Sequence, residues 1–269
     1  MPELPEMETY RRLLQQQIQG KIIADALVER EKTINMPPQR FAQILQGNRL
    51  TLIDRRGKHL LFHLENRYVL LLHLMLGGFL YLGASEDRLP RTAQVTLSFG
   101  DRILYFHGLR LGYLHLLTPD QLDERLGELG PEPLAPAFTA SQLSQMLAGK
   151  RGILKTALVD QHWLAGIGNC YSDEICFRAR IMPTRRIPAL APGEIARLYD
   201  SMQTVLNEAV AHGGYMETPL YQGDRLTGGF DERCLVYDRG GEPCPRCGHA
   251  IVGDRLSSRK VFYCTSCQS

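Results

Sequence analysis

The residues best suited to covalent chemistry stand at the start of the chain, which reads Met-Pro-Glu-Leu-Pro-Glu over positions 1–6. Removal of the initiator Met1 is usual before a small second residue, and it leaves Pro2 with a free secondary amine. The pKa of an α-amino group lies near 8, so a fraction of such amines is unprotonated at neutral pH. An unprotonated amine attacks electrophilic carbon and forms an imine or iminium. Pro2 is therefore a candidate nucleophile.

A helix is predicted immediately after this amine. Pro5 suits a first helical turn. Apolar residues then recur with helical spacing as far as the glycine at position 20, at Met7, Tyr10, Leu14 and Ile18. The positive end of the helix dipole disfavours a protonated amine beside it, which favours the reactive form of Pro2. Taken alone, these residues favour a purely structural role, in which the prolines start the helix and Glu3, Glu6 and Glu8 complement its dipole.

Four cysteines near the other end of the chain have the spacing of a metal site. They form two Cys-x2-Cys pairs separated by sixteen residues: Cys244, Cys247, Cys264 and Cys267. Four thiolates presented from two tight turns close a tetrahedral site and leave no open position, so we predict one structural Zn²⁺ ion. Two disulfides are the alternative, and they are disfavoured because no secretory signal is recognisable and intracellular thiols stay reduced.

The two ends, together with what lies between them, resemble the formamidopyrimidine-DNA glycosylase and endonuclease VIII family of bifunctional base-excision repair enzymes. The resemblance covers essentially the whole chain. It is carried by the segments 2–6, Arg55–Lys58, Leu129–Leu134, Lys155, Ala165–Asn169, Asp173–Glu174, Gly213–Gly214 and the four cysteines. Several motifs in family order are far harder to match by chance than one.

The resemblance implies a reaction for the amine at the start of the chain. The implied catalytic residues are Pro2, which attacks C1′ of an extruded nucleotide, Glu3, which donates a proton to the sugar, and Lys58, which reaches a phosphate from the turn at Gly57. Base loss and two eliminations then nick the strand. The expected partner is double-stranded DNA with oxidised purines, such as 8-oxoguanine and formamidopyrimidines, or with abasic sites. Glu6 is expected to support the site.

Two loops are implied to fill the gap left by the extruded base, and both depart from the family pattern. Leu76, in the stretch 73–77, stands near the place of an inserted methionine. The stretch 109–112 reads Leu-Arg-Leu-Gly. An ungapped alignment there places leucines on the family's arginine and phenylalanine, with Arg110 between them. An apolar wedge suits a base stack. Whether Arg110 or Leu111 inserts, and which lesion and opposite base are preferred, stays open.

Three further residues are implied to hold the DNA backbone. Gly166 and Gly168 let the chain turn closely before a predicted helix, whose first amides suit a phosphate. The resemblance identifies this segment as a helix-two-turn-helix, with Asn169 at the phosphates and Lys155 beside it. It also places Arg259 at the tip of the zinc-held hairpin, where a guanidinium grips phosphate oxygens. An ordinary helix connection is the alternative reading of the glycines.

Length and composition are compatible with several domains. With 269 residues, of which 44% are hydrophobic, the chain can bury two or three cores. The net charge of +2 does not by itself indicate a polyanionic partner. Basic side chains nevertheless gather at 55–58, 150–155, 178–186 and 255–260, where they neutralise phosphates if the fold brings them to one face.

The hydrophobic pattern predicts an α+β protein with three domains. Short apolar runs between Lys21 and about Leu117 favour an antiparallel β-sandwich or flattened barrel. Helices are predicted over 118–127, 139–148, 154–159, 172–180 and 194–212, and a strand over 234–237. The expected domains are a catalytic β-sandwich with an N-terminal helix (1–132), a helical DNA-binding domain with the helix-two-turn-helix (133–232) and a zinc ribbon (233–269).

Two other functions stay open. Specificity for oxidised pyrimidines, as in endonuclease VIII, is kept open by the altered wedge residues. It is opposed by the segment 215–230, because formamidopyrimidine glycosylases carry a loop of this size over the flipped base. A non-catalytic zinc-ribbon protein that binds damaged DNA is opposed by the Pro2–Glu3 pair. No targeting segment and no membrane-length apolar run is recognisable, so we expect a monomeric, cytoplasmic, nucleoid-associated protein.

Overall fold

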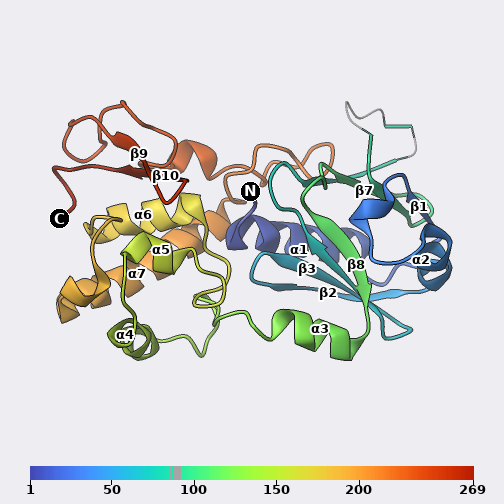
Figure 1. The fold of residues 1–269 in the computed structure, drawn as a ribbon. Coiled ribbons are helices and arrows are strands. Elements are labelled where there is room, and N and C mark those ends of the chain that lie inside the picture. Colours follow the sequence, from blue (N-terminus) through green and yellow to red (C-terminus); the bar gives the residue numbers. More distant parts are fainter. Residues whose placement is uncertain (85, 88–91) are drawn as a thin grey trace. The chain divides into compact units, whose positions relative to one another are not determined.

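The computed structural model describes residues 1–84, 86–87 and 92–269 (Figure 1). Contacts group these residues into two compact units. Unit 1 comprises Met1–Glu128 and Met216–Gly229, and unit 2 comprises Leu129–Tyr215 and Phe230–Ser269. We call Met216–Gly229 the return loop, because the chain comes back to unit 1 for this segment alone. The loop expected to cover a damaged base thus folds with the sandwich that carries Pro2.

Helix α1 (Leu4–Ile18) begins directly after the candidate nucleophile. The backbone N–H of Glu3, the residue before the helix, donates to Oε2 of Glu6 at 2.7 Å, and Pro5 occupies the first turn. The predicted apolar stripe is buried, which confirms the predicted helix. Gly20, with φ of 83°, reverses the chain after the last turn.

Unit 1 is an antiparallel β-sandwich, as predicted. One sheet has the strand order β1-β6-β7-β5 and the other β2-β3-β4-β8. The strands are β1 (Asp25–Val28), β2 (Leu50–Arg56), β3 (His59–Leu64), β4 (Val69–His73), β5 (Phe79–Gly83), β6 (Val95–Ser98), β7 (Ile103–His107) and β8 (Tyr113–Leu117). One hydrophobic core joins both sheets to α1, and Phe62 meets Phe106 edge-on within it, with ring centroids 6.3 Å apart.

Three short helical segments interrupt or follow these strands. The helix α2 (Pro38–Leu45) was not predicted, although Pro38 suits a first turn and Phe41 and Leu45 are buried four residues apart. A 3₁₀ turn, η1 (Glu31–Thr33), precedes it. The helix α3 (Pro119–Leu126) follows β8 as predicted, with the Thr118 side chain accepting from the N–H of Gln121 at 3.4 Å.

Unit 2 is built from four helices and a β-hairpin. The helices are α4 (Ala140–Ala148), α5 (Leu154–Leu158), α6 (Asn169–Ala179) and α7 (Pro192–Ala211), with 3₁₀ turns η2 (Ile187–Ala189) and η3 (Asp231–Arg233). The hairpin consists of β9 (Val252–Leu256) and β10 (Arg259–Tyr263). The apolar face of α7 packs into the helical core, as its periodicity predicted. Within the described chain, no helix combines the length and hydropathy needed to cross a membrane.

The strand predicted over 234–237 is wrong. The backbone N–H groups of Leu235, Val236 and Tyr237 all donate to the Glu174 carboxylate, at 2.8 to 3.0 Å. A carboxylate with several acceptor positions therefore takes the place of a neighbouring strand. Residues 233–269 also share unit 2 with the helices, and Val236 and Phe262 pack in one cluster with Phe177 of α6. The division into three domains at 132/133 and 232/233 stays a prediction.

Candidate active site

Pro2 lines a cavity within unit 1. The cavity has a volume of about 680 Å³, within the range of pockets that hold small organic ligands. Its walls come from the start of the chain, from the segment that opens β5, and from the return loop: Met1, Pro2, Gly77, Gly78, Phe79, Tyr81, Met216, Thr218, Pro219, Tyr221, Gln222 and Gly223. Aromatic rings and Pro2, whose nitrogen becomes a free amine when Met1 is removed, thus line one space, which suits a planar heterocycle attached to an electrophilic carbon.

Glu3 and Glu6 follow Pro2 in the chain and are not among the residues that line this cavity. Both side chains are buried, and the bond from the Glu3 N–H to Glu6 fixes the backbone at the residue that follows the nucleophile. Glu6 therefore supports the site through the backbone, a role that the sequence alone did not define.

The return loop owes its shape to Asp224. Oδ1 of Asp224 accepts from the N–H groups of Leu226 (2.9 Å) and Thr227 (3.2 Å). Oδ2 accepts from the N–H of Leu220 (2.9 Å) and the Thr227 hydroxyl (2.6 Å). Burial opposes ionisation of Asp224, but these hydrogen bonds outweigh it and lower the pKa of the carboxyl group. Leu220 is fully buried and its carbonyl accepts from the Leu82 N–H of β5 at 2.6 Å, so the loop is anchored to the sheet.

Lys58 follows the turn between β2 and β3, where Gly57 has φ of 55°. It neighbours His73 at the end of β4. Burial, then Lys58 and then Arg125, lower the pKa of His73 to about 4. The His73 imidazole is therefore neutral at neutral pH, and its Nδ1 accepts from the Met75 N–H at 3.2 Å. His73 shapes the loop that carries Leu76. Sequence reasoning missed this role, because only the fold shows which backbone amide the ring meets.

Leu76, Arg110 and Leu111 line a second cavity of unit 1, with a volume of about 750 Å³. Leu76 and Leu111 are 61% and 63% exposed, whereas Leu109 is 1% exposed and belongs to the core. The two loops approach closely at Gly108, where an added Cβ would lie 1.9 Å from the Gly77 carbonyl oxygen. The structure thus brings together the three candidate wedge residues and turns Leu109 away from them.

The segment before α6 in unit 2 forms two consecutive turns around Gln161. Its side-chain amide donates to the carbonyls of Val159 (2.9 Å) and Ile167 (2.8 Å), and its Oε1 accepts from the Gly166 N–H at 2.9 Å. Asn169 is the first residue of α6, and its Oδ1 has no hydrogen-bond partner among the described residues. That oxygen is buried, so any contact of Asn169 with a phosphate must come from its side-chain N–H₂ group.

Lys155 does not lie on the surface. It is 1% exposed, and its Nζ donates to Oδ1 of Asp173 at 2.5 Å and to the Asn169 carbonyl at 3.3 Å. Burial raises the pKa of Asp173, while Lys155 and the Phe262 N–H oppose that shift. Lys155 was expected to bind DNA beside Asn169. In the structure its ammonium instead bonds within unit 2, to Asp173 and to the Asn169 backbone.

The same helix supports the hairpin that carries Arg259. Oδ2 of Asp173 accepts from the Phe262 N–H of β10 at 3.0 Å. The exposed Arg259 begins β10, directly after Ser257 and Ser258, whose φ values of 48° and 67° form the tight turn. Arg246 lies over the Phe177 ring of α6, 4.2 Å from its centroid, and donates to the Phe177 carbonyl. Asn169 and Arg259 are therefore both held by α6.

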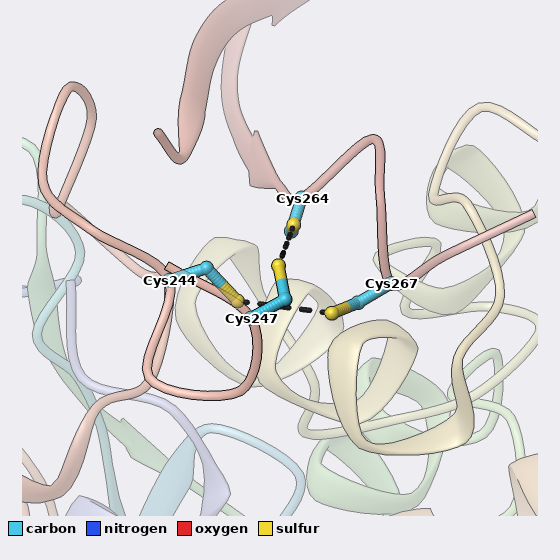
Figure 2. Close-up of side chains that lie close together, drawn as sticks. All are labelled: Cys244, Cys247, Cys264 and Cys267. Carbon is cyan, nitrogen blue, oxygen red and sulfur yellow. Dashed lines mark hydrogen bonds between the residues drawn. The ribbon is translucent and has the colours of Figure 1, made fainter. Parts of the chain in front are cut away.

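The sulfur atoms of the four cysteines lie close together (Figure 2). All four Sγ atoms lie within 4.8 Å of one another, with Cys247 and Cys264 3.5 Å apart and Cys244 and Cys267 3.9 Å apart. Sulfur ligands 2.3 Å from a tetrahedral zinc ion lie about 3.8 Å from each other. The cluster therefore fits one Zn²⁺ ion with no open coordination position, which holds the two loops of the ribbon together.

Three family models match successive parts of the chain. Residues 1–113 match the formamidopyrimidine-DNA glycosylase N-terminal domain, and residues 129–219 match the H2TH domain of the same enzyme. Residues 241–269 match a zinc finger found in FPG and IleRS. This last match includes all four cysteines and confirms the predicted structural zinc ion.

Whole-chain relatives agree with these matches. The chain is 37% identical over 273 residues to formamidopyrimidine-DNA glycosylase of Pelotomaculum thermopropionicum, covering 100% of this chain and 99% of that protein. It is 40% identical over 256 residues to that of Moorella thermoacetica, covering 93% of each. Among solved structures, Lactococcus lactis Fpg bound to DNA with an N7-benzyl-Fapy-dG gives a TM-score of 0.92 at 30% identity, covering 99% of each chain. Its complex with abasic-site DNA also gives 0.92, at 29% identity.

Proposed function

The chain belongs to the formamidopyrimidine-DNA glycosylase family, and we propose how its own residues carry out the reaction of that family. The protein is a bifunctional DNA glycosylase and AP lyase of base-excision repair. Its substrate is double-stranded DNA that contains oxidised purines or abasic sites. Because that substrate is duplex DNA, we also propose a cytoplasmic, nucleoid-associated place of action.

Pro2 is the nucleophile in this proposal. Its nitrogen forms a bond to C1′ as the bond from C1′ to the base breaks, and the base leaves with that electron pair and a proton. Glu3 supplies a proton to the ring oxygen as the sugar opens, which leaves an iminium between Pro2 and C1′. The iminium acidifies C2′. Loss of its proton expels the 3′-phosphate, a second elimination expels the 5′-phosphate, and water releases Pro2.

The observation that carries this assignment is the position of Pro2 on the wall of the 680 Å³ cavity. The return loop contributes Tyr221 to the same cavity, while Phe79 and Tyr81 add aromatic rings. Aromatic and apolar faces suit a flipped base, which is held by stacking and by hydrogen bonds to its edge. The amine and the base pocket thus belong to one compact unit.

Phosphate and wedge contacts complete the proposal. Lys58, Asn169 and Arg259 bind the DNA backbone, while Lys155 acts indirectly by holding Asn169 in place. Contacts of this kind fix the register on the duplex and make binding steeply salt-dependent. Leu76 and Leu111 supply apolar surface to the space left by the extruded base, and Arg110 lines the same cavity.

Borohydride trapping tests the nucleophile and the substrate together. Two duplexes are compared, one with 8-oxoguanine opposite cytosine and one with thymine glycol, with an abasic duplex as positive control. We expect a covalent product on the 8-oxoguanine and abasic duplexes, mapped to Pro2 by mass spectrometry. Trapping on thymine glycol but not on 8-oxoguanine would move the substrate to oxidised pyrimidines. No trapping on any duplex would favour the non-catalytic DNA-binding protein.

A chain with a peptide fused before Met1 is the matched control. It keeps every residue of the protein but converts the Pro2 amine into an amide. We expect it to bind an uncleavable abasic-site analogue as the free chain does, and to give no trapped product. Trapping by the fused chain at the same rate would assign the nucleophile to another amine.

A further inference from the structure

We propose that Glu8 is a positioning residue, which acts through Arg55 to orient the turn that carries Lys58 against the helix that carries Pro2. The inference rests on the proposed phosphate contact of Lys58. It assigns a role to a carboxylate of α1 that takes no part in the reaction itself.

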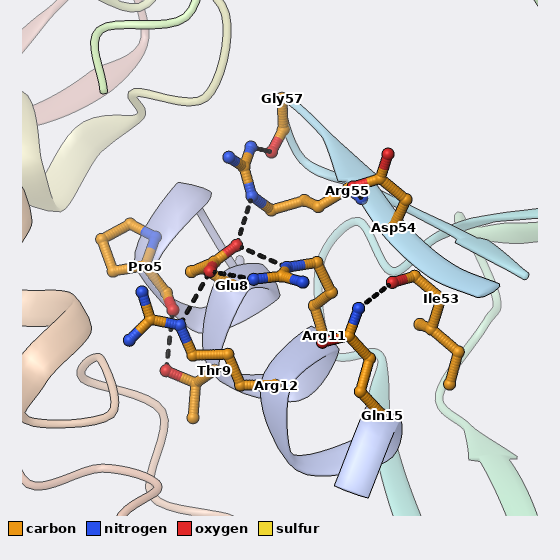
Figure 3. Close-up of polar contacts among 10 residues, drawn as sticks. All are labelled: Pro5, Glu8, Thr9, Arg11, Arg12, Gln15, Ile53, Asp54, Arg55 and Gly57. Carbon is orange, nitrogen blue, oxygen red and sulfur yellow. Dashed lines mark hydrogen bonds and ion pairs between the residues drawn. The ribbon is translucent and has the colours of Figure 1, made fainter. Parts of the chain in front are cut away.

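Glu8 lies at the centre of three guanidinium groups (Figure 3). Its Oε1 accepts from Arg11 Nη2 at 2.6 Å and from Arg12 Nε at 2.8 Å. Its Oε2 accepts from Arg11 Nε at 2.9 Å and from Arg55 Nε at 3.2 Å. Arg11 and Arg12 belong to the same helix as Glu8, whereas Arg55 comes from β2. Arg55 thus links two elements that are distant in sequence.

The other end of Arg55 reaches the turn itself. Its Nη1 donates to the Gly57 carbonyl oxygen at 3.1 Å (Figure 3). That oxygen belongs to the peptide group that joins Gly57 to Lys58, so the bond fixes the plane from which the Lys58 side chain departs. Gly57 adopts φ of 55°, a conformation that glycine enters easily and also leaves easily. A tether at this peptide therefore restricts the direction of Lys58.

Burial favours this reading over a surface ion cluster. The Glu8 and Arg55 side chains are only 11% and 9% exposed, against 52% for Arg12. Burial opposes ionisation of Glu8, but hydrogen bonds from Arg11 and Arg12 outweigh it and hold its pKa at about 2. The Glu8 carboxylate is therefore ionised at neutral pH. Arg55 is correspondingly turned toward α1, although the sequence grouped it with the phosphate-binding basic residues 55–58.

The test is the salt dependence of binding to a duplex with an uncleavable abasic-site analogue. Each phosphate contact contributes about 0.9 to the slope of log K against log salt concentration. We expect Glu8→Gln and Arg55→Lys to lower that slope by about 0.9, with roughly tenfold weaker binding at low salt, as Lys58→Ala does. Glu8→Gln makes the protein more positive, which by itself would strengthen binding to DNA, and Arg55→Lys leaves the net charge unchanged. Weaker binding by either variant is therefore not a simple effect of net charge.

A double mutant separates positioning from stability. If Glu8 acts through Lys58, Glu8→Gln adds no further change in slope to Lys58→Ala. Arg12→Ala is the matched control, because Arg12 bonds to the same carboxylate from an exposed position on α1, and we expect it to keep the wild-type slope. Thermal melting identifies any variant that is unfolded, and Arg55→Lys then decides in place of Glu8→Gln.

Three outcomes would overturn the inference in distinguishable ways. A wild-type slope in Glu8→Gln and Arg55→Lys, beside a lowered slope in Lys58→Ala, removes the positioning role and leaves the proposed function intact. A wild-type slope in Lys58→Ala removes the phosphate contact of the proposed function as well. Additive slopes in the double mutant would show that Glu8 acts on binding without Lys58.

Discussion

Two histidines close to Lys58 are held in their neutral form by burial. His59 and His73 are neighbours on adjacent strands, with ring centroids 4.5 Å apart. Burial, followed by the neighbouring His73, lowers the pKa of His59 to about 3. A protonated imidazole here would compete with Lys58 for the same phosphate and repel it, so two neutral rings leave the cation of Lys58 undisturbed.

The lowered pKa values of His59 and His73 predict that the folding stability of unit 1 falls in acid. An unfolded histidine titrates near pH 6.5, while folded His73 has a pKa of about 4. The unfolded chain therefore binds more protons between these values, and stability falls as pH drops through that window. We expect the wild type to lose about 1 to 2 kcal/mol per histidine between pH 7 and pH 5. His73→Gln should lose correspondingly less, as measured by urea unfolding at both pH values.

The comparison with His73→Gln isolates the histidine pair, because all other titrating groups are common to both proteins and His59 owes part of its own pKa shift to His73. Glu8, with a pKa of about 2, contributes mainly below pH 4.5. An equal loss of stability in both proteins between pH 7 and pH 5 would contradict the assignment to His73.

The role of a residue was predictable where its partners are close in sequence, and it was not predictable where its partners come from distant parts of the chain. The spacing of the four cysteines specified a metal site because the ligands are brought together by two short turns. Lys155 and Arg55 carry the same charge as Lys58 and Arg259, and sequence alone placed all four near phosphate. Only the fold shows that Asp173 and Glu8 engage Lys155 and Arg55 inside the protein, and that Lys58 is also buried whereas Arg259 is exposed.

Helices were predictable wherever the repeat of apolar residues continued over several turns. The stripes of α1 and α7 span several turns, so their helices were recognised. Helix α2 has only two turns, and its pattern is lost among neighbouring strands. The segment 234–237 has the composition of a strand, but its amides bond to Glu174, a residue sixty positions earlier in the chain. Hydrogen bonds from these amides to a distant side chain therefore outweigh the local β-propensity of the segment.

The return loop is an element without regular structure, and its order depends on one side chain. Asp224→Ala removes four hydrogen bonds that close the loop, including those to Leu220 and Thr227. Because the loop forms a wall of the cavity beside Pro2, we expect excision of 8-oxoguanine to slow roughly tenfold, from about 1.4 kcal/mol of lost positioning. Cleavage at an abasic site, which has no base to hold, should remain close to wild type. Single-turnover rates on both duplexes measure the difference.

Glu217→Ala is the matched control for the loop, because Glu217 is exposed in the same segment and does not line the cavity. It should leave both rates unchanged. Equal slowing of both reactions in Asp224→Ala would show instead that the loop supports Pro2 or the fold of unit 1, and not the base.

At the scale of the whole molecule, the two units have separate hydrophobic cores, and the zinc ribbon shares its core with α6. Residues that act on the sugar therefore lie in unit 1, whereas Asn169 and Arg259 lie in unit 2. Zinc contributes folding free energy to a small ribbon that buries little apolar surface of its own. The metal should accordingly control DNA binding without controlling the core of unit 1.

Zinc removal tests this division and the predicted boundary at 232/233. After chelation, or in Cys247→Ser, we expect the ribbon to lose its fold, because three remaining thiolates cannot close the tetrahedral site. Binding to the abasic-site analogue should weaken at least tenfold through loss of Arg259, a charge-assisted contact. Limited proteolysis read by mass spectrometry should then cut within 233–269 while residues 1–128 stay protected.

Protection of the ribbon without zinc would mean that its contacts with α6 hold it folded, since Asp173 and Glu174 bond to it directly. Cleavage throughout both units would instead make the protein one cooperative unit, in which the metal stabilises the catalytic sandwich as well.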